Sequence, residues 1–442
     1  MIDVDNSVLS ADAFVVPFNF VFIVVSYHSL CPSSLLRSIL HSLPPPSRTN
    51  REPLLLSLHF IKSMTVLIVG SGVIGLRTAV ELIRRKTRVR IVSPRHPLHA
   101  STCSVGAGGL WMPFHCDDER TDKWAFETLQ ELMSYVGSDK SDGGADDDTS
   151  LVEIVPAVSF KKCDTKDPPL WATDPRGGEL KFQTLAIDEL YKASISQNFR
   201  LPKRELIEDA GYQHSWLFHP PIVDSPRMLT HLVEELESSE YTDDMKFDRA
   251  EYASIQEMVE DAKKFGCDSL VNCTGLGSRE LCNDSSLVGA RGVLLQFDRS
   301  SCQWDVQPNS RDSVIMIEDP PLGSETAPCY MIPRGDIVAV GGTYLEGDGE
   351  TEIRLEEMAK ILQNARAMGI DTDNSEPPNR WVGFRPYRPS ARLEVDEEYS
   401  KHGVKVVHNF GYGGSGWTVF TGAAREAASL LFSAQWSRSR DV

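Results

Sequence analysis

The chain has 442 residues, of which 41% are hydrophobic and 24% charged, the composition of a globular protein with enough length for two or three domains. Its formal net charge of −18 at pH 7 argues against nucleic acid or an anionic membrane surface as the main partner. The nine cysteines are scattered along the chain, which fits a reducing compartment. Neither His-Glu-x-x-His nor Gly-x-Ser-x-Gly occurs, so the sequence does not support a zinc or serine hydrolase.

Residues 1–63 differ in character from the rest of the chain. The apolar run 13–27 is about fifteen residues long, which is short for a membrane span, and acidic rather than basic residues precede it. A proline-rich stretch follows, and Met64 stands directly before the first predicted strand. We therefore interpret residues 1–63 as an N-terminal extension that is either disordered or absent from the natural protein.

Residues 65–93 have the pattern of a strand, a glycine turn, a helix and a second strand. An apolar run leads into a Gly-x-Gly-x-x-Gly motif, Gly70-Ser71-Gly72-Val73-Ile74-Gly75. Gly70 permits a tight turn, Gly72 lets the backbone approach a pyrophosphate, and Gly75 lets the helix pack on the strand. The N-terminus of the helix then attracts the negative charge of a phosphate, so the unit predicts a dinucleotide site. The alternative is an ordinary strand-turn-helix without a ligand.

The acidic residue that usually binds the ribose hydroxyls, about 20 residues beyond the glycines, is missing. The second predicted strand ends in Ser93-Pro94-Arg95-His96. Arg95 either faces a 2′-phosphate, as in an NADP enzyme, or lies along an adenosine diphosphate. The motif therefore indicates a dinucleotide without saying which one.

A loop of small residues follows the second strand. It contains Ser101, Thr102, Gly108, Gly109 and Leu110. Small hydroxyl residues followed by glycines suit a loop against a second part of a large ligand, and a flexible turn is the alternative. Beyond this loop, apolar periodicity predicts a helix over residues 121–136 and a strand over residues 151–160.

The middle of the chain returns to the first sheet and then changes to short strands. A helix is predicted from Ser225, and the buried run 269–273 breaks into a glycine turn, like a strand of the nucleotide-binding sheet that returns late in the sequence. The domain that binds the dinucleotide is therefore expected to be discontinuous. Short runs separated by turn residues predict an antiparallel sheet over 290–297, 313–317, 330–332 and 337–341, with a helix over 355–368.

The last third of the chain carries a stiffened arginine and a second glycine loop. Arg385 precedes a proline, which predicts a rigid bidentate clamp for a carboxylate, with a surface arginine as the alternative. The loop before a helix predicted over 417–432 contains Gly411, Gly413, Gly414, Ser415, Gly416, Trp417 and Thr418. Two glycine-rich corners exceed the needs of one nicotinamide cofactor, and they fit FAD, with the pyrophosphate at the first corner and the flavin ring at the second.

Four motifs together resemble the FAD-dependent D-amino acid oxidases, a family that includes D-aspartate oxidase, and the fungal D-amino acid oxidases resemble the chain most. The likeness covers residues 65–431, and its carriers are residues 70–76, 109–111, 383–389 and 408–414. The resemblance implies an α/β fold with a discontinuous Rossmann-like FAD-binding domain over 65–150, 226–288 and 385–435. It also implies an antiparallel-sheet substrate domain of α+β type over 151–225 and 289–384.

The resemblance implies roles for single residues. Arg385 corresponds to the arginine that grips the substrate α-carboxylate, and Tyr330 to a tyrosine that bonds the same group. Tyr344 corresponds to a second tyrosine of yeast members, and the carbonyl of Gly414 to the acceptor of the substrate amine. The implied chemistry is hydride transfer from Cα to flavin, which needs orientation and no catalytic acid or base.

The resemblance also implies a substrate class. D-aspartate oxidases tend to carry a histidine at the position of Phe114 and an arginine at that of Tyr344, and His115 lies one residue away. An apolar Phe114 suits neutral D-amino acids, which would yield 2-oxo acids, ammonia and hydrogen peroxide with molecular oxygen. D-aspartate oxidase and an NADP-dependent dehydrogenase are the alternatives among enzymes, and a flavoprotein without activity is a third.

The resemblance also implies a peroxisomal location, although the chain ends in Arg-Asp-Val, unlike Ser-Lys-Leu, and a cytoplasmic location is the alternative. We expect no nucleic-acid, membrane or metal partner, and the chain is expected to form a homodimer.

Overall fold

The computed structural model describes residues 64–114, 116–137, 150–162, 168–249, 251–307, 309–376 and 378–433, together with two strands near the N-terminus. Those strands, β1 (Ala13–Phe18) and β2 (Val21–Ser26), pair antiparallel and belong to a unit, Met1–Ile61, separate from the unit Lys62–Val442. The rest of the predicted N-terminal extension lies outside the described residues, so that interpretation stays a prediction. Among the described residues, no helix has the length and apolar character needed to cross a membrane.

One sheet organises the larger unit, and its first part is parallel. The parallel strands, in spatial order, are β10 (Thr242–Lys246), β4 (Arg88–Val92), β3 (Thr65–Val69), β11 (Ser269–Asn272) and β18 (Lys405–Tyr412). β3 and β4 belong to one β-α-β unit, whereas β10, β11 and β18 come from distant parts of the sequence. The strand at 269–272 therefore does return to the first sheet, as expected. Every residue of β3 is buried, as in a parallel sheet covered on both faces.

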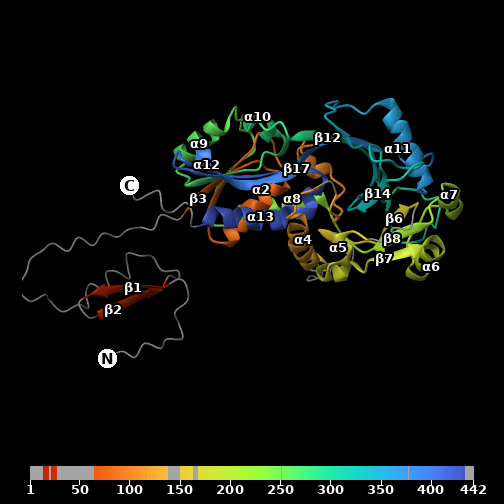
Figure 1. Ribbon diagram of the computed structural model, residues 1–442, viewed down its shortest axis with the longest axis horizontal. Coiled ribbons are helices and arrows are strands. Elements are labelled where there is room, and N and C mark those ends of the chain that lie inside the picture. The colour runs from red at the N-terminus through yellow and green to blue at the C-terminus, as the bar shows by residue number, and fades with distance from the viewer. Residues whose placement is uncertain are drawn as a thin grey trace, which may run out of the picture. The chain divides into compact units, whose positions relative to one another are not determined.

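Alternate residues of β3 pack into two different cores. Val66 and Ile68 contact helices α2 (Val73–Arg84), α4 (Thr121–Tyr135), α8 (Ser225–Glu237) and α13 (Gly416–Phe432) through one hydrophobic cluster. Leu67 and Val69 join the other cluster, with α9 (Ile255–Lys264), α10 (Ser278–Leu281) and α12 (Glu397–Ser400). Figure 1 shows these two groups of helices on opposite faces of the parallel strands.

The sheet continues as a mainly antiparallel part. Its strands, in order, are β17 (Asn379–Asp396), β12 (Val288–Asp298), β15 (Ile337–Gly341), β14 (Cys329–Arg334), β13 (Val314–Ile317), β6 (Ala157–Lys161), β8 (His214–Phe218) and β7 (Gln183–Ala186). Only β13 and β6 run parallel to each other here. A short strand, β16 (Leu345–Glu346), pairs with β12, and β5 (Val152–Ile154) pairs with β9 (Pro221–Val223) in a separate small sheet.

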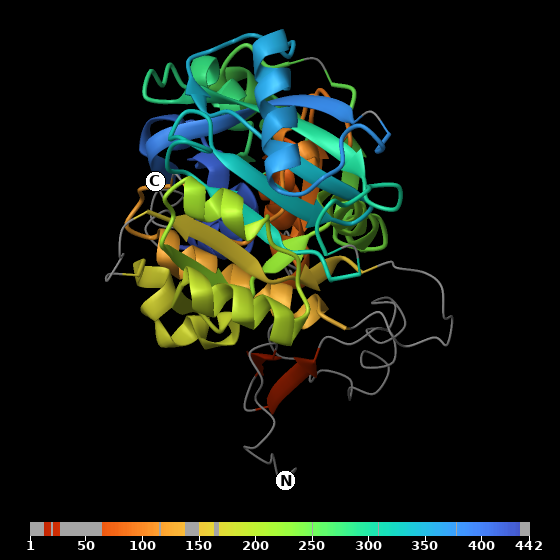
Figure 2. The ribbon, with the colours of Figure 1, turned by 90° about the vertical axis from the view of Figure 1, so that its right-hand side faces the viewer.

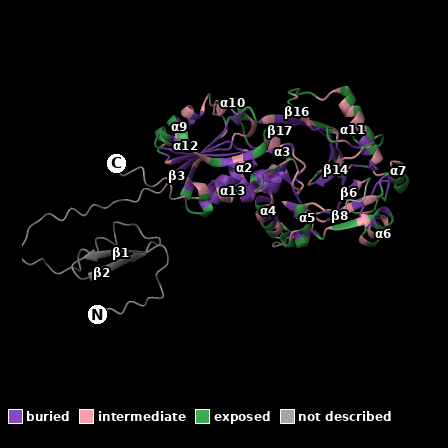
Figure 3. Cartoon of the chain, in the orientation of Figure 1, coloured by how far each residue is buried: buried purple, intermediate pink, exposed green. Residues whose placement is uncertain are grey.

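Further helices cover the antiparallel part. They are α11 (Leu355–Ala367), α6 (Ile187–Gln197) and α7 (Arg204–Asp209), whose apolar residues share one core with the strands. Figure 2 shows α11 lying across these strands, and Figure 3 shows buried residues along the sheet with exposed ones on the outer helices. The remaining turns of helix are α3 (Cys103–Gly106), α5 (Leu170–Thr173), η2 (Pro175–Leu180), η3 (Gly275–Gly277) and η4 (Gly413–Ser415).

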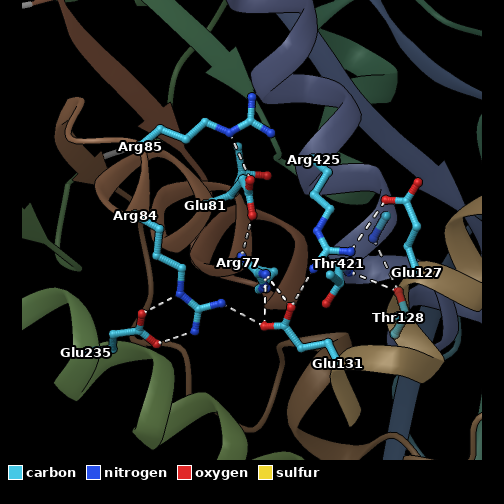
Figure 4. A network of polar contacts seen from close by, with 12 residues as sticks. Arg77, Glu81, Arg84, Arg85, Glu127, Thr128, Glu131, Glu235, Thr421 and Arg425 are labelled. Atoms are coloured by element: carbon cyan, nitrogen blue, oxygen red, sulfur yellow. Dashed lines mark hydrogen bonds and ion pairs between the residues drawn. The ribbon is translucent and has the colours of Figure 1, made fainter. Parts of the chain in front are cut away.

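A buried ion-pair network fixes α2 against its neighbouring helices (Figure 4). Glu131 on α4 lies 2.9 Å from Arg77, 2.8 Å from Arg84 and 3.0 Å from Arg425, so one carboxylate bonds α2 and α13 together. The guanidinium of Arg77 is 1% exposed, and Glu235 on α8 pairs with Arg84. The network therefore ties together α2 and α13, the two helices that begin at the glycine-rich corners.

The predicted fold class is confirmed, with some corrections of detail. The helix predicted from Ser225 is capped by Asp224, whose side chain accepts from the Arg227 amide at 3.3 Å. The strand predicted over 151–160 is two strands, β5 and β6, and the helix near the C-terminus starts at Gly416. The domain boundaries stay a prediction, because β17 runs without a break through the proposed boundary at residues 384 and 385.

Candidate active site

A cavity lies where the parallel and antiparallel parts of the sheet meet. Its walls come from the start of α2, the loop over residues 103–114, strands β14 and β17, and the second glycine corner. Its wall includes Val73, Ile74, Cys103, Ser104, Gly108, Gly109, Leu110, Phe114, Glu318, Tyr330, Ile332, Tyr344, Trp381, Arg385, Gly413, Gly414, Gly416 and Trp417.

All five residues that the sequence assigns to the substrate line this cavity. The Arg385 guanidinium lies 5.5 Å from the centroid of the Tyr344 ring, and Phe114 meets that ring edge-on at 6.0 Å. A Cβ placed on Gly414 would stand 2.8 Å from Cδ1 of Phe114, so no larger residue fits there. The structure therefore brings together residues from three separate parts of the chain.

Two glycines on neighbouring strands make room for the arginine and the tyrosine. A Cβ on Gly292 of β12 would lie 2.3 Å from Nη1 of Arg385, and a Cβ on Gly341 of β15 would lie 2.1 Å from Cζ of Tyr330. Arg385 also donates from Nη1 to the carbonyl of Thr343 at 3.2 Å. Strand pairing and this hydrogen bond thus add to the stiffness predicted from the following proline, and sequence reasoning missed the part of the two glycines.

Both phenols in the cavity remain protonated at neutral pH. Burial raises the pKa of Tyr330, and the neighbouring Arg385 opposes that rise without reversing it. Burial also raises the pKa of Tyr344, with a further contribution from Glu346. A protonated phenol donates a hydrogen bond, so the arginine and the two tyrosines present donors to an anionic oxygen.

The first glycine corner places the start of α2 at the cavity. Gly70 has a φ of 115° and could carry no Cβ, which would stand 2.3 Å from the carbonyl oxygen of Cys273. Gly72 is the N-cap residue, without a side-chain cap, and the Val73 amide donates to Oγ of Ser104 at 3.1 Å. The helix therefore opens onto the cavity with backbone amides that can bind an anion.

The second glycine corner is tied to the loop that carries Phe114. The Ser415 hydroxyl bonds both the amide and the carbonyl of Phe114, each at 2.8 Å. Thr418 bonds the backbone of Met112 in the same two ways, at 3.3 and 2.9 Å. These two hydroxyls therefore hold the protein loop, while Gly413, Gly414 and Gly416 face the cavity.

Residues 65–430 match the family described as FAD dependent oxidoreductase. The chain belongs to this family. It is similar to the D-amino-acid oxidase of Rubrobacter xylanophilus, with 28% identity over 82% of this chain and 94% of that protein. It is also similar to human D-aspartate oxidase, with 28% identity over 83% of this chain and 94% of that protein.

Among solved structures, the FAD-bound L-alpha-glycerophosphate oxidase of Mycoplasma pneumoniae has a similar fold, with a TM-score of 0.59 and 16% identity over 84% of this chain and 95% of that one. The chain is thus an FAD-dependent oxidoreductase, and the NADP-dependent dehydrogenase is set aside.

The residues of this oxidoreductase fit FAD at both corners. The amides at the start of α2 suit a pyrophosphate. At the second corner, Gly413, Gly414 and Gly416 line the cavity without side chains, which suits a flat ring. Val73, Ile74, Gly108, Gly109, Leu110, Gly413, Gly414, Gly416 and Trp417 line the cavity. The other predicted cofactor residues lie outside its lining: Gly70, Ser71, Gly72, Gly75, Arg95, Ser101, Thr102, Gly411, Ser415 and Thr418.

Arg95 lies at the surface of the oxidoreductase. Its guanidinium is 49% exposed and pairs with Glu251 at 3.3 Å, while Ser71 donates to its carbonyl at 2.8 Å. A role along the adenosine part of the cofactor remains a prediction for this residue.

Sequence reasoning missed several residues that line the cavity, among them Cys103, Ser104 and Trp381. Ser104 lies within one turn of the predicted Ser101 and Thr102 and contacts the start of α2. Cys103 is neutral, because burial raises the pKa of its thiol. Trp381 lies four positions before Arg385, and only a prediction of strand β17 would have shown that both face the cavity.

Proposed function

We propose that the chain oxidises neutral D-amino acids to 2-oxo acids, using molecular oxygen and releasing ammonia and hydrogen peroxide. The observation that carries this proposal is the convergence of Arg385, Tyr330 and Gly414 on one cavity beside the two glycine corners. A relative named D-amino-acid oxidase, of which the aligned region covers 94%, supports the same reaction.

The protein's part in this reaction is to hold the substrate in one orientation. Arg385 and the Tyr330 hydroxyl bind the α-carboxylate, because a guanidinium and a protonated phenol are both donors. The carbonyl of Gly414 would accept from the substrate amine, so that carboxylate and amine together fix the orientation of the substrate Cα. FAD, held at the two glycine corners, would supply the hydride-accepting and oxygen-reducing chemistry, so the side chains would have to orient the substrate and none would have to act as acid or base.

The cavity favours a neutral side chain over that of D-aspartate. Among the described residues that line it, Arg385 is the only lysine or arginine, and Glu318 adds a carboxylate. A second substrate carboxylate would therefore be buried without a cation of its own. His115, which stands one residue from the position where D-aspartate oxidases tend to carry a histidine, lies outside the described residues.

Steady-state kinetics on the purified protein test this proposal. A higher kcat/KM for D-alanine or a larger neutral D-amino acid than for D-aspartate supports it. A higher kcat/KM for D-aspartate would favour the alternative of a D-aspartate oxidase, the name of the human relative.

The proposal includes a peroxisomal location, where the hydrogen peroxide that the reaction releases is broken down, with the cytoplasm as the alternative. It also includes a homodimer as the working form. Microscopy of a fluorescent fusion and light scattering of the purified protein test these two points.

A further inference from the structure

Trp381 connects the strand of Arg385 to the loop on the cofactor side of the cavity. The tryptophan lies on β17 and lines the cavity. Its indole Nε1 donates to the carbonyl of Ala100 at 3.0 Å. The hydrogen bond joins the antiparallel strand to a segment that follows directly after the first β-α-β unit.

The indole ring fits a slot that two glycines create. A Cβ on Gly106 would stand 2.0 Å from Cε2 of Trp381, and a Cβ on Gly383 would stand 2.0 Å from Cη2. Neither contact could be relieved without moving the ring, because real Cβ atoms do not approach this closely. The ring is therefore held between α3 and its own strand.

The segment that Trp381 holds also contacts both glycine corners. Within it, the Ser104 hydroxyl accepts from the amide of Val73 at 3.1 Å, at the start of α2. The Ser104 carbonyl accepts from Nε1 of Trp417 at 3.0 Å, at the start of α13. Residues 100–106 thus touch the two places where the cofactor fits, and Trp381 attaches them to β17.

We propose that Trp381 is a positioning residue that couples the cofactor loop to the substrate arginine. FAD binding fixes residues 100–106, and the indole transmits that order along β17 to Arg385, four positions away. The part of this inference that concerns Arg385 rests on the proposed function, while the part that concerns FAD does not.

The first test measures FAD affinity of the apoprotein through quenching of FAD fluorescence. Trp381→Phe removes the N–H donor and keeps an aromatic ring, so the Kd for FAD should rise about 5- to 10-fold. Trp216→Phe is the matched control, since Trp216 lies on β8 and outside the cavity lining, and it should leave the Kd unchanged. An FAD Kd for Trp381→Phe within twofold of the parent value would overturn the proposal.

The second test measures coupling to the substrate site at saturating FAD. Benzoate, a carboxylate without an amine to oxidise, is titrated while the flavin spectrum is followed, so this reading does not depend on turnover. Trp381→Phe should weaken benzoate binding about threefold or more. Weakened FAD binding with unchanged benzoate affinity would refute the coupling. The FAD and benzoate affinities can be measured even if the parent protein fails to oxidise D-amino acids. Such a failure would contradict the proposed reaction and leave the test of Trp381 intact.

A double-mutant cycle separates the indole slot from general loss of stability. Gly106→Ala should weaken FAD binding in the parent, because the new Cβ meets the ring, and should have no further effect when combined with Trp381→Ala. Gly178→Ala is the control, because its Cβ would meet nothing within 4 Å. Additive effects of the two changes would contradict the proposed slot, and if Trp381→Ala does not fold, Trp381→Leu, which also removes the ring, replaces it in the cycle.

Discussion

Gly292 offers a way to move the substrate arginine without touching it. The glycine lies on β12 opposite Gly383 of β17, and Arg385 extends over it. In Gly292→Ala, the new Cβ would stand 2.3 Å from Nη1 and 2.6 Å from both Cζ and Nη2 of Arg385. The guanidinium is the flexible end of its side chain, so it must shift by roughly 1 Å while the strands stay in place.

The size of the expected effect follows from the contacts that this shift breaks. The hydrogen bond from Nη1 to the Thr343 carbonyl is 3.2 Å long and would be lost, together with the alignment toward a carboxylate. A hydrogen bond to a charged group contributes about 1.5–3 kcal/mol. We therefore expect Gly292→Ala to lower kcat/KM for D-alanine about 10- to 100-fold, mainly through a higher KM.

The assay is oxygen consumption against D-alanine concentration, with benzoate affinity and the melting temperature measured alongside. Gly349→Ala is the control, since a Cβ there would meet nothing within 4 Å, and it should behave like the parent. The melting temperature of Gly292→Ala should stay within a few degrees of the parent value. A kcat/KM within twofold of the parent would refute the argument that Arg385 must occupy this position to bind substrate.

Three further predictions follow from the same contacts. Tyr330→Phe removes one hydrogen-bond donor. In steady-state kinetics it should raise the KM for D-alanine about 3- to 10-fold with kcat nearly unchanged. An unchanged KM would count against a contact between the Tyr330 hydroxyl and the substrate carboxylate. Ser104→Ala should weaken FAD binding about 3- to 10-fold in a fluorescence titration, because the Ser104 hydroxyl holds the Val73 amide at 3.1 Å. An FAD affinity equal to that of the parent would contradict a role for Ser104 at the cofactor site. The pKa of Asp396 is lowered to about 2 from the usual 3.8, chiefly by the hydrogen bond from His408. This carboxylate therefore stabilises the fold above about pH 4, and the stabilisation is lost as the pH falls toward 2. Asp396→Asn should therefore lower the free energy of unfolding by about 2 kcal/mol at pH 7 and by much less near pH 2, measured with urea, and an equal loss at both values would disprove the linkage.

The parallel part of the fold could be predicted from the sequence because its signals are local. The largely apolar β3, the φ of 115° at Gly70 and the helix that follows are all encoded within residues 65–84. The glycine loop before α13 is local in the same way. Those two corners, with the return of β11 to the sheet, were enough to indicate a dinucleotide-binding fold.

Strand β17 could not be predicted in the same way, because its prolines resemble those of a loop. Pro386 nevertheless lies within the strand, opposite Gly289 of β12, and the register with β18 shifts between Tyr387 and Arg392. A strand that carries such an irregularity tolerates a proline that a regular central strand would not. The role of Arg385 as a clamp therefore stays a prediction, and pairing within β17 adds a source of rigidity that the sequence pattern did not indicate.

The contacts that complete the site are long-range, and the sequence alone contains no sign of them. The slot for Trp381 depends on Gly106, and the space for Arg385 depends on Gly292, each far away in the chain. The ion pairs of Glu131 with α2 and α13 are of the same kind. Such pairings become visible only when the strands and helices are placed beside one another.

The most direct test of the central claim is to add D-alanine to the purified holoenzyme without air and follow the flavin absorbance. The account predicts that the parent protein loses its flavin absorbance with D-alanine but not with L-alanine, and that Arg385→Met needs a concentration about 100-fold higher or more. A flavin that stays oxidised at millimolar concentrations of every neutral D-amino acid would contradict the account, and so would equal reduction of the parent and Arg385→Met.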